Sequence, residues 1–293
     1  MKRTTKIKLV LQCLSVGIIF SITLLLPSCK EEGPIILLEE AEIPLVDTTY
    51  VVDNIPEAEE KVVLMEEFTG VRCTNCPIGH AKVAELYAAH GERFIAIGVH
   101  SNFLGAPYEG NEDFRTESAN ALNNALGPVN GKPSAFVDRK IFPGNQTRDI
   151  INPDLWTGFV AQQLASATPL NIDLEIVDLN ENERIVRYRI ALTYTENAQA
   201  HNLGFAITEN NLVAAQLNAG TVIEDYNHQH VLRTFLTPVI GTPLTVELEM
   251  GRVIIKEFEF EVPLEWNIDN LELIAFIRAA NDEIVQAKMV KFN

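Results

Sequence analysis

Two cysteines separated by two residues, Cys73 and Cys76, stand directly before a proline and a helical pattern. Pro77 suits the first turn of a helix, where the missing N–H costs nothing. The unpaired N–H groups at a helix N-terminus stabilise an anion, so we expect a lowered pKa for the Cys73 thiol, with Arg72 adding a nearby positive charge. The spacing therefore predicts that Cys73 is a nucleophile and that Cys76 resolves the mixed disulfide formed on it.

Two other roles for this cysteine pair compete with that prediction. The other cysteines of the chain, Cys13 and Cys29, lie in the N-terminal segment. Structural zinc usually needs four ligands, and the sequence has no second Cys or His pair at zinc-finger spacing, so we predict no metal site. A disulfide that only stiffens a short loop stays open, although so short a loop restricts the unfolded chain least. The sequence predicts no cofactor.

The elements that position the cysteines follow from the hydrophobic pattern. Residues 62–68 are a β-branched and apolar run, which predicts a buried strand leading into the cysteines. His80, in the first turn of the following helix, is expected to pack or to face water. The other predicted elements are a helix ending at Gly91, a strand at 94–99, a helical insertion at about 101–130 with a helix from about 113 to 126, and a last helix capped at 152–153.

This arrangement resembles the active site of thioredoxin-like proteins. The resemblance implies a buried carboxylate beneath the second cysteine, and Glu67 stands where it would accept the proton of Cys76. An exposed or salt-bridged Glu67 is the alternative. The resemblance also implies a cis-proline that starts the strand facing the dithiol. Pro133 fits that role, because X–Pro bonds adopt cis at low cost, and Lys132 would offer backbone groups to a bound peptide. A trans turn proline is the alternative.

After residue 169 the apolar pattern changes to period two, which predicts an all-β region. Seven strands in about 125 residues favour an immunoglobulin-like β-sandwich. His228 and His230 are expected on one strand face, where two imidazoles can hold a metal, but the absence of an identifiable third ligand favours a structural role. The strands are expected at 170–177, 185–195, 203–208, 244–248, 252–262, 271–279 and 283–292.

The N-terminal residues have the pattern of an export signal. Four basic residues precede an apolar stretch over residues 9–26, a length that a membrane span also has. The stretch ends in Leu26-Pro27-Ser28-Cys29, which resembles a bacterial lipobox, although proline is unusual there. The resemblance implies cleavage after Ser28 and lipidation of Cys29. A plain signal peptide and an uncleaved anchor are the alternatives.

Charge limits the class of partner. The formal net charge of −17 argues against binding to nucleic acid and against electrostatic docking on anionic lipid. A lipid anchor would instead attach the chain to the membrane, in a compartment beyond the inner membrane where disulfides persist. We therefore predict a signal peptide (1–28), a lipidated acidic tether (29–60) whose residues 44–53 can add a strand, a thioredoxin-like α/β domain with a central mixed sheet and helices on both faces (61–168), and a β-sandwich (169–293).

Four segments together resemble the twenty-eight-kilodalton outer-membrane-protein family of Bacteroidota lipoproteins. They are residues 66–80 (EEFTGVRCTNCPIGH), 131–139 (GKPSAFVDR), 227–233 (NHQHVLR) and 274–287 (IAFIRAANDEIVQA). The resemblance implies an outer-membrane lipoprotein that faces the periplasm or the cell surface. Two functions are consistent with it. One is thiol–disulfide exchange on extracytoplasmic proteins. The other is surface binding or adhesion through the sandwich, with the cysteine pair as a structural disulfide.

Overall fold

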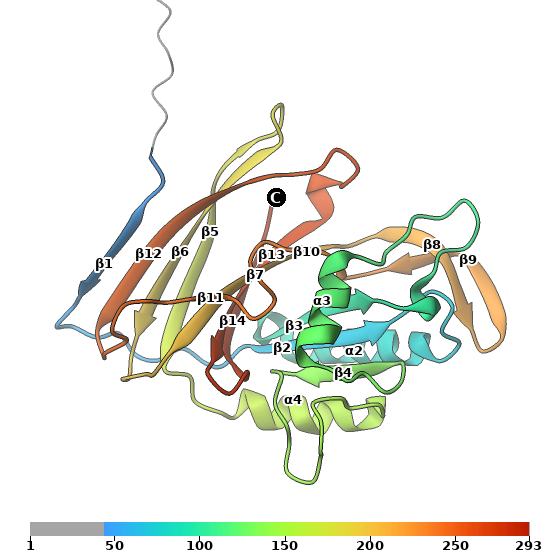
Figure 1. Cartoon of the computed structure of the whole chain (residues 1–293), viewed down its shortest axis with the longest axis horizontal. Coiled ribbons are helices and arrows are strands. Elements are labelled where there is room, and N and C mark those ends of the chain that lie inside the picture. Colours follow the sequence, from blue (N-terminus) through green and yellow to red (C-terminus); the bar gives the residue numbers. More distant parts are fainter. Residues whose placement is uncertain (1–43, 293) are drawn as a thin grey trace, which may run out of the picture. The chain divides into compact units, whose positions relative to one another are not determined.

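The computed structural model of the chain describes residues 44–292, which form mixed sheets with few helices (Figure 1). Residues 45–292 belong to one compact unit. The predicted signal peptide and the predicted lipidation site, Cys29, lie outside the described residues. No helix within the described range is long and apolar enough to cross a membrane.

The larger sheet has eight strands and runs through the whole unit. Its centre is fully buried, because β2 and β3 are apolar on both faces apart from two glutamates, Thr69 and His100. β2 pairs in parallel with β3 and antiparallel with β4. The strand order is β14 (Ile284–Lys291), β13 (Leu271–Ala279), β7 (His201–Glu209), β10 (Val231–Phe235), β3 (Phe94–His100), β2 (Val63–Thr69) and β4 (Ser134–Val137), with β11 (Thr242–Pro243) paired to β7.

The junction between β3 and β10 joins strands from the two sides of residue 169. Val231 pairs in parallel with Gly98, whose N–H donates to the carbonyl of His230 at 2.7 Å. An uncovered edge of β3 would leave a row of unpaired backbone groups, and β10 covers it. The predicted boundary near residue 169 separates these two segments, and residues 231–235 were not predicted as a strand, whereas the structure joins both in one sheet.

The smaller sheet has four antiparallel strands and packs on one half of the larger sheet. Burial alternates along β6 (Ile185–Tyr194), whose inward residues meet β7 and β13 in one apolar core. The prediction that residues 44–53 add a strand is confirmed, since β1 pairs with β12. The predicted strand at 244–248 is wrong, because the short β11 ends at Pro243, which has no N–H, and an irregular segment follows. The order is β1 (Asp47–Val51), β12 (Arg252–Glu261), β6 (Ile185–Tyr194) and β5 (Leu170–Asn180).

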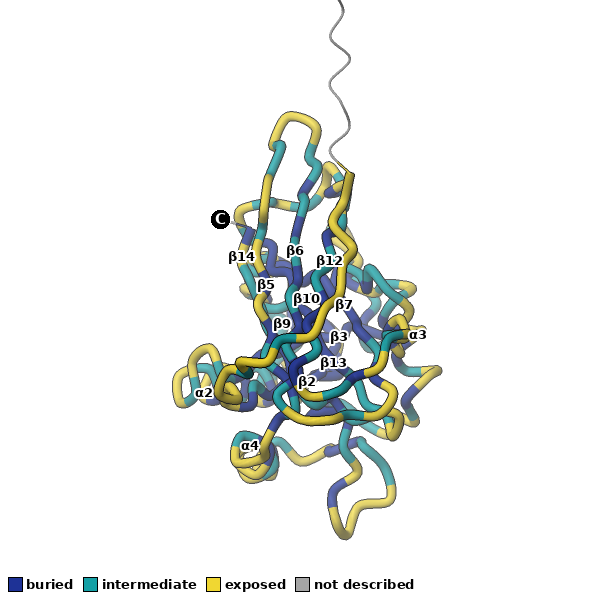
Figure 2. Tube along the Cα trace, turned by 90° about the vertical axis from the view of Figure 1, so that its left-hand side faces the viewer, coloured by how far each residue is buried: buried dark blue, intermediate teal, exposed yellow. Residues whose placement is uncertain are grey.

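The helices cover both faces of the β2–β3 region, and Figure 2 shows these strands as buried. Val83 and Trp156 place α2 and α4 on one face, and Leu122 places α3 on the other. α3 starts four residues later than predicted, where the side chain of Thr116 accepts from the N–H of Ala119 at its first turn. The bounds are α2 (Cys76–His90), α3 (Glu117–Leu126) and α4 (Trp156–Leu164), with 3₁₀ turns at Gly91–Arg93, Phe103–Gly105, Pro153–Leu155 and Ile268–Asn270.

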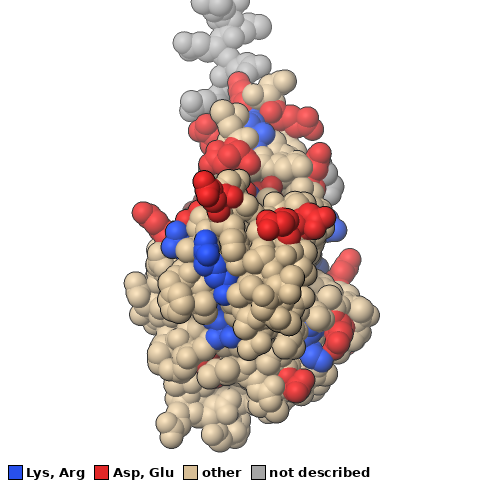
Figure 3. Space-filling view, turned by 90° about the vertical axis from the view of Figure 1, so that its right-hand side faces the viewer, with Lys and Arg blue, Asp and Glu red and all other residues tan. Residues whose placement is uncertain are grey.

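The third sheet among the described residues has two strands, which the sequence pattern did not predict. β8 (Leu212–Asn218) and β9 (Thr221–His228) form a hairpin, hereafter the β8–β9 hairpin. Its turn residues, Ala219 and Gly220, both have positive φ, as a tight two-residue hairpin turn requires. On the face of the described residues drawn in Figure 3, acidic side chains gather above a short group of basic ones, and no continuous basic surface forms.

Candidate functional site

Cys73 and Cys76 form a disulfide at the start of α2. Cys76 is the first residue of the helix and Pro77 is in its first turn, so the predicted placement of the pair between a strand and a helix N-terminus is confirmed. Both cysteines are buried: Cys73 is 4% exposed and Cys76 is 0% exposed. Their roles as nucleophile and resolving thiol stay predictions.

The β8–β9 hairpin lies over the loop that carries the disulfide. The N–H of Leu217 donates to the carbonyl of Val71 at 2.8 Å, and the N–H of Ala219 donates to the carbonyl of Thr74 at 3.0 Å. The side-chain amide of Gln216 donates to the carbonyl of Cys73 at 3.1 Å. Local sequence pattern does not predict this contact, because its two sides lie more than 140 residues apart in the chain.

Glu66 and Glu67 on β2 point to opposite faces of the sheet, as strand alternation predicts. Glu66 is buried in an ion pair with Arg139 at 2.6 Å. Glu67 is 4% exposed, and its Oε1 has no hydrogen-bond partner among the described residues. This carboxyl lies beneath α2, since a Cβ added to Gly79 would stand 2.5 Å from Oε1. The prediction that Glu67 is buried is therefore confirmed, and an exposed Glu67 is excluded.

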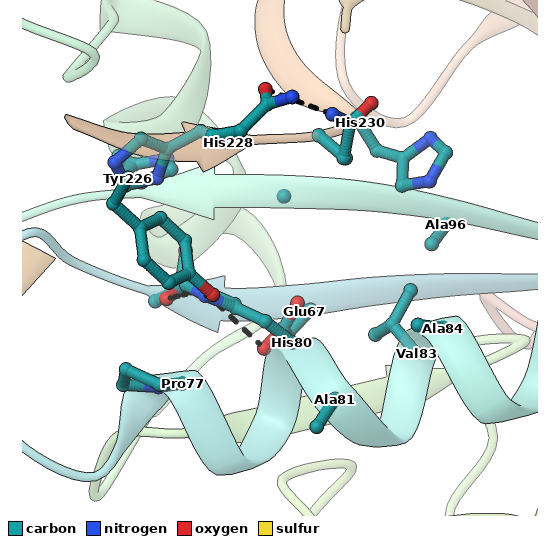
Figure 4. Close-up of a pocket in the computed structure, with 15 residues that line it drawn as sticks. Glu67, Pro77, His80, Ala81, Val83, Ala84, Ala96, Tyr226, His228 and His230 are labelled. Carbon is teal, nitrogen blue, oxygen red and sulfur yellow. Dashed lines mark hydrogen bonds and ion pairs between the residues drawn. The ribbon is translucent and has the colours of Figure 1, made fainter. Parts of the chain in front are cut away.

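Burial raises the pKa of Glu67 to about 8, so its carboxyl is mainly neutral at pH 7. The nearest imidazole nitrogen, Nε2 of His80, is 4.0 Å from Oε1. Burial lowers the pKa of His80 to about 3, so this contact joins two neutral groups. His80 Nε2 also lies 2.7 Å from Oγ1 of Thr69, and Nδ1 lies 2.8 Å from the hydroxyl of Tyr226 (Figure 4).

A cavity of about 300 Å³ opens beside these groups, between α2, the strands β2 and β3, and the end of β9. Small residues leave the space, among them Ala81, Ala84 and Gly98. Glu67 and Tyr226 contribute polar groups to its wall, as Figure 4 shows. The wall also carries the imidazoles of His80, His100, His228 and His230.

His100 and His228 are both buried, and neither has a well-aligned hydrogen-bond partner among residues 44–292. Their rings lie 5.7 Å apart, and that of His228 also contacts Phe114. Burial lowers the pKa of His228 to about 4 and that of His100 well below its ordinary value. Both imidazoles are therefore neutral at pH 7.

The prediction that His228 and His230 share a strand face is wrong. β9 ends at His228, and His230 lies in a turn with φ 54°, where its ring stacks on Tyr87. Across the described part of the chain, no group of three or more His, Cys, Asp or Glu side chains is arranged to hold a metal ion.

The peptide bond between Lys132 and Pro133 is cis, as predicted. A Cβ on Gly79 would stand 2.9 Å from Cβ of Pro133, which places the proline against the first turns of α2. The side chain of Lys132 turns inward and donates to the carbonyls of Thr69 and Ser101 at 2.5 and 2.7 Å. Burial lowers the pKa of this lysine to about 7. The side chain of Lys132 is therefore occupied within the fold, and peptide binding by its backbone stays a prediction.

A family model described as outer membrane protein Omp28 matches residues 119–293, more than half of the chain. The chain belongs to the Omp28 family. Its location is accordingly the outer membrane, which agrees with the expected membrane association. The match includes the Lys132–Pro133 strand and the β8–β9 hairpin of this Omp28 protein but begins after the cysteine pair.

Three solved structures are similar to this Omp28 protein. HBP35 of Porphyromonas gingivalis is 21% identical, with a TM-score of 0.61 over 79% of this chain and 75% of that chain. A protein from Agrobacterium tumefaciens is 12% identical, with a TM-score of 0.50 over 80% and 97%. A domain of the outer membrane lipoprotein Omp28 from Porphyromonas gingivalis is 15% identical, with a TM-score of 0.29 over 43% and 89%. At these identities the first two show a shared fold alone. None of the curated proteins matches the chain.

Proposed function

We propose that this outer-membrane protein exchanges thiols and disulfides with extracytoplasmic proteins through Cys73 and Cys76. The observation that carries the proposal is the carboxyl of Glu67, buried beneath α2 with an oxygen that lacks a partner among residues 44–292. Such a group costs folding free energy, and a disulfide that only stiffened a loop would have no use for it. A carboxyl with a raised pKa, beneath the first turns of the helix that begins at Cys76, is instead suited to proton transfer.

A partner dithiol reduces the Cys73–Cys76 disulfide in two steps. A partner thiolate attacks Sγ of Cys73, so a mixed disulfide forms and Cys76 leaves as a thiolate. The neutral carboxyl of Glu67 donates a proton to that thiolate. The second partner thiol then gives its proton to water and attacks the partner sulfur of the mixed disulfide, which expels Cys73 as a thiolate. Two electrons pass from the partner dithiol to Cys73 and Cys76.

The reverse direction uses the same groups in the opposite order. The Cys73 thiolate attacks one sulfur of a partner disulfide, which expels the other partner sulfur as a thiolate and leaves a mixed disulfide. Cys76 then gives its proton to the Glu67 carboxylate and attacks Sγ of Cys73, which expels the second partner sulfur as a thiolate. Pro133 and the backbone of Lys132 would hold the partner segment, because the proline packs against the first turns of the helix that carries the pair.

The remaining parts of the chain serve this chemistry in the proposal. Residues 61–168 act as a thioredoxin-like unit, and the core shared by β5, β6, β7, β12 and β13 supports a sandwich in the following part. Lipidation of Cys29 anchors the protein, with the partner proteins on the periplasmic or the cell-surface side.

One observation favours a second function. Both cysteines are buried beneath the β8–β9 hairpin, as expected for a structural disulfide. The β-rich part would then carry a binding or adhesion function.

Trapping of a mixed disulfide separates the two functions. The variant Cys76→Ser, treated with glutathione disulfide under native conditions, is expected to form a glutathione adduct on Cys73 that mass spectrometry detects. The matched variant Cys73→Ser should form far less adduct, because Cys76 is the more deeply buried of the two and is not the predicted nucleophile. Equal adduct yields in both variants, or none in either, would favour the structural disulfide.

A further inference from the structure

We infer that the β8–β9 hairpin is a cover that must open before Cys73 and Cys76 can exchange with a protein partner. This inference rests on the proposed function, since a cover over a purely structural disulfide would have nothing to control. It adds a conformational step to the exchange and assigns that step to a particular element.

The hairpin is held at its tip, over the disulfide loop, and by further contacts at its base. Within the described residues its two strands form a separate sheet and join neither of the two larger sheets. Besides the backbone bonds from Leu217 and Ala219, the N–H of Gly220 donates to Oγ1 of Thr74 at 3.0 Å. The side chain of Gln216 is wholly buried and reaches the carbonyls of Gly70 and Cys73.

When the hairpin lifts, hydrogen bonds to water can replace these hydrogen bonds. The loop carbonyls then face solvent, and the hairpin keeps its own ladder. At the base of the hairpin, Ala214 packs with Val71, Phe114 and Val231, and the ring of His228 contacts Phe114. The N–H of Ala215 donates to Oδ1 of Asn111 at 2.6 Å. Opening breaks these contacts but no ladder bond to either of the larger sheets, so the rest of the described fold can stay intact.

Thiol–disulfide exchange needs the opening, because the attacking sulfur must reach Sγ of the disulfide. Cys73 is 4% exposed with the hairpin in place, which leaves little room for a protein thiolate to approach its sulfur. A second contact of the hairpin links access to the disulfide with proton transfer at Glu67. Tyr226, on β9, is hydrogen-bonded to His80 beside Glu67, so lifting β9 also opens the wall of the cavity to water.

Reduction kinetics of the full oxidised chain test the cover. Thiols are counted by alkylation and mass spectrometry at increasing dithiothreitol concentration. If opening limits the reaction, the rate reaches a plateau that is independent of dithiothreitol. Gln216→Leu and Gln216→Asn, which remove the amide contact to the loop or shorten its reach, are expected to raise the plateau about tenfold, as the loss of one or two hydrogen bonds implies.

Val213→Thr is the matched control, because Val213 lies on the same strand but is 66% exposed. Its plateau should equal that of the native chain. Hydrogen exchange gives a readout that involves no sulfur: the amides of Leu217 and Ala219 should exchange at the plateau rate. A rate proportional to dithiothreitol throughout, equal in all variants, would overturn the inference. So would exchange of these amides only on global unfolding.

The two ideas fail in different ways. A cysteine pair with a catalytic reduction potential but no effect at Gln216 would reject the cover and leave the proposed exchange standing. A disulfide that resists reduction until the protein unfolds would reject the proposed thiol exchange. Hydrogen exchange at the amides of Leu217 and Ala219 would still measure the opening of the hairpin.

Discussion

Glu66 and Glu67 are neighbours in sequence with opposite environments. Glu66 forms an ion pair with Arg139, whose guanidinium also donates to the carbonyl of Val239. Glu67 is neutral and faces the cavity with an unpartnered oxygen, as judged over residues 44–292. The difference follows from strand alternation, which turns one carboxyl toward the α3 face and the other toward α2. The two positions therefore form a matched pair for mutation.

Glu67→Gln is expected to stabilise the protein at alkaline pH. Because burial raises the folded-state pKa to about 8, the folded protein keeps a proton that the unfolded chain loses above about 4.5. The native carboxyl therefore loses stability as pH rises from about 4.5 to 8. Removing it should raise the free energy of unfolding at pH 8 by about 2 to 5 kcal/mol relative to pH 4, measured by urea denaturation. The same variant should slow thiol exchange.

Glu66→Gln is the control for that prediction. It leaves the guanidinium of Arg139 buried without its charge partner, so we expect a loss of about 3 to 5 kcal/mol. A Glu67→Gln variant that is destabilised to a similar extent at every pH would contradict the account of Glu67 as a neutral buried acid.

The imidazole of His228 predicts sensitivity to acid. Its folded-state pKa of about 4 lies below the ordinary value of 6.5, so the unfolded chain takes up the proton first as pH falls. Stability is therefore lost between about pH 6.5 and 4. His228→Phe, which keeps an aromatic ring beside Phe114, should recover about 2 to 3 kcal/mol at pH 4 relative to pH 7. Unfolding curves at the two pH values test this, and an unchanged difference between them would contradict it.

At the scale of elements, the contact between α2 and its neighbours depends on Gly79. A Cβ there would meet Glu67, Pro133 and Trp156, the last at 3.1 Å. Gly79→Ala should therefore destabilise the protein by about 1 to 3 kcal/mol, despite the better helix propensity of alanine. Thermal unfolding measures this.

Gly158 on α4 provides the comparison. It is exposed, and a Cβ there would meet no atom within 4 Å, so Gly158→Ala should stabilise by up to about 1 kcal/mol. If both substitutions had the same effect, the packing proposed around the first turns of α2 would be wrong.

Most individual elements could be predicted from local pattern. The apolar run before Cys73 and the period-two pattern after residue 169 correctly indicated β2, β5, β6, β12, β13 and β14. The β8–β9 hairpin was missed because its turn is Ala219-Gly220, a weaker signal than Asn-Gly. Segment 244–248 has an alternating apolar pattern but no partner strand, since pairing is decided by tertiary contacts that propensity does not contain.

At the scale of the whole compact unit, the eight-stranded sheet ties both halves together. Because β10 bridges β3 and β7, the two halves share main-chain hydrogen bonds as well as side-chain packing. We expect one cooperative thermal transition, with calorimetric and van't Hoff enthalpies that agree. Two separate transitions in calorimetry would indicate independent domains divided near residue 169.

The site itself could be predicted only in part. The burial of Glu67 and the position of the cysteine pair at the start of a helix could be predicted, because both follow from a local motif, and the cis bond before Pro133 followed from the strand that this proline precedes. The cavity wall was not, since His100 and His228 come from strands more than 120 residues apart and meet only through the β3–β10 junction. Sequence pattern gives no sign of such a meeting. The burial of the disulfide under a distant hairpin escaped prediction for the same reason.

The reduction potential of the Cys73–Cys76 pair, measured by equilibration of the folded chain with glutathione buffers, tests the central claim most directly. Thiol exchange predicts a value between about −120 and −270 mV, the range of catalytic dithiols. A value below about −300 mV, or a pair that resists reduction until the protein unfolds, would contradict exchange and identify the bond as structural.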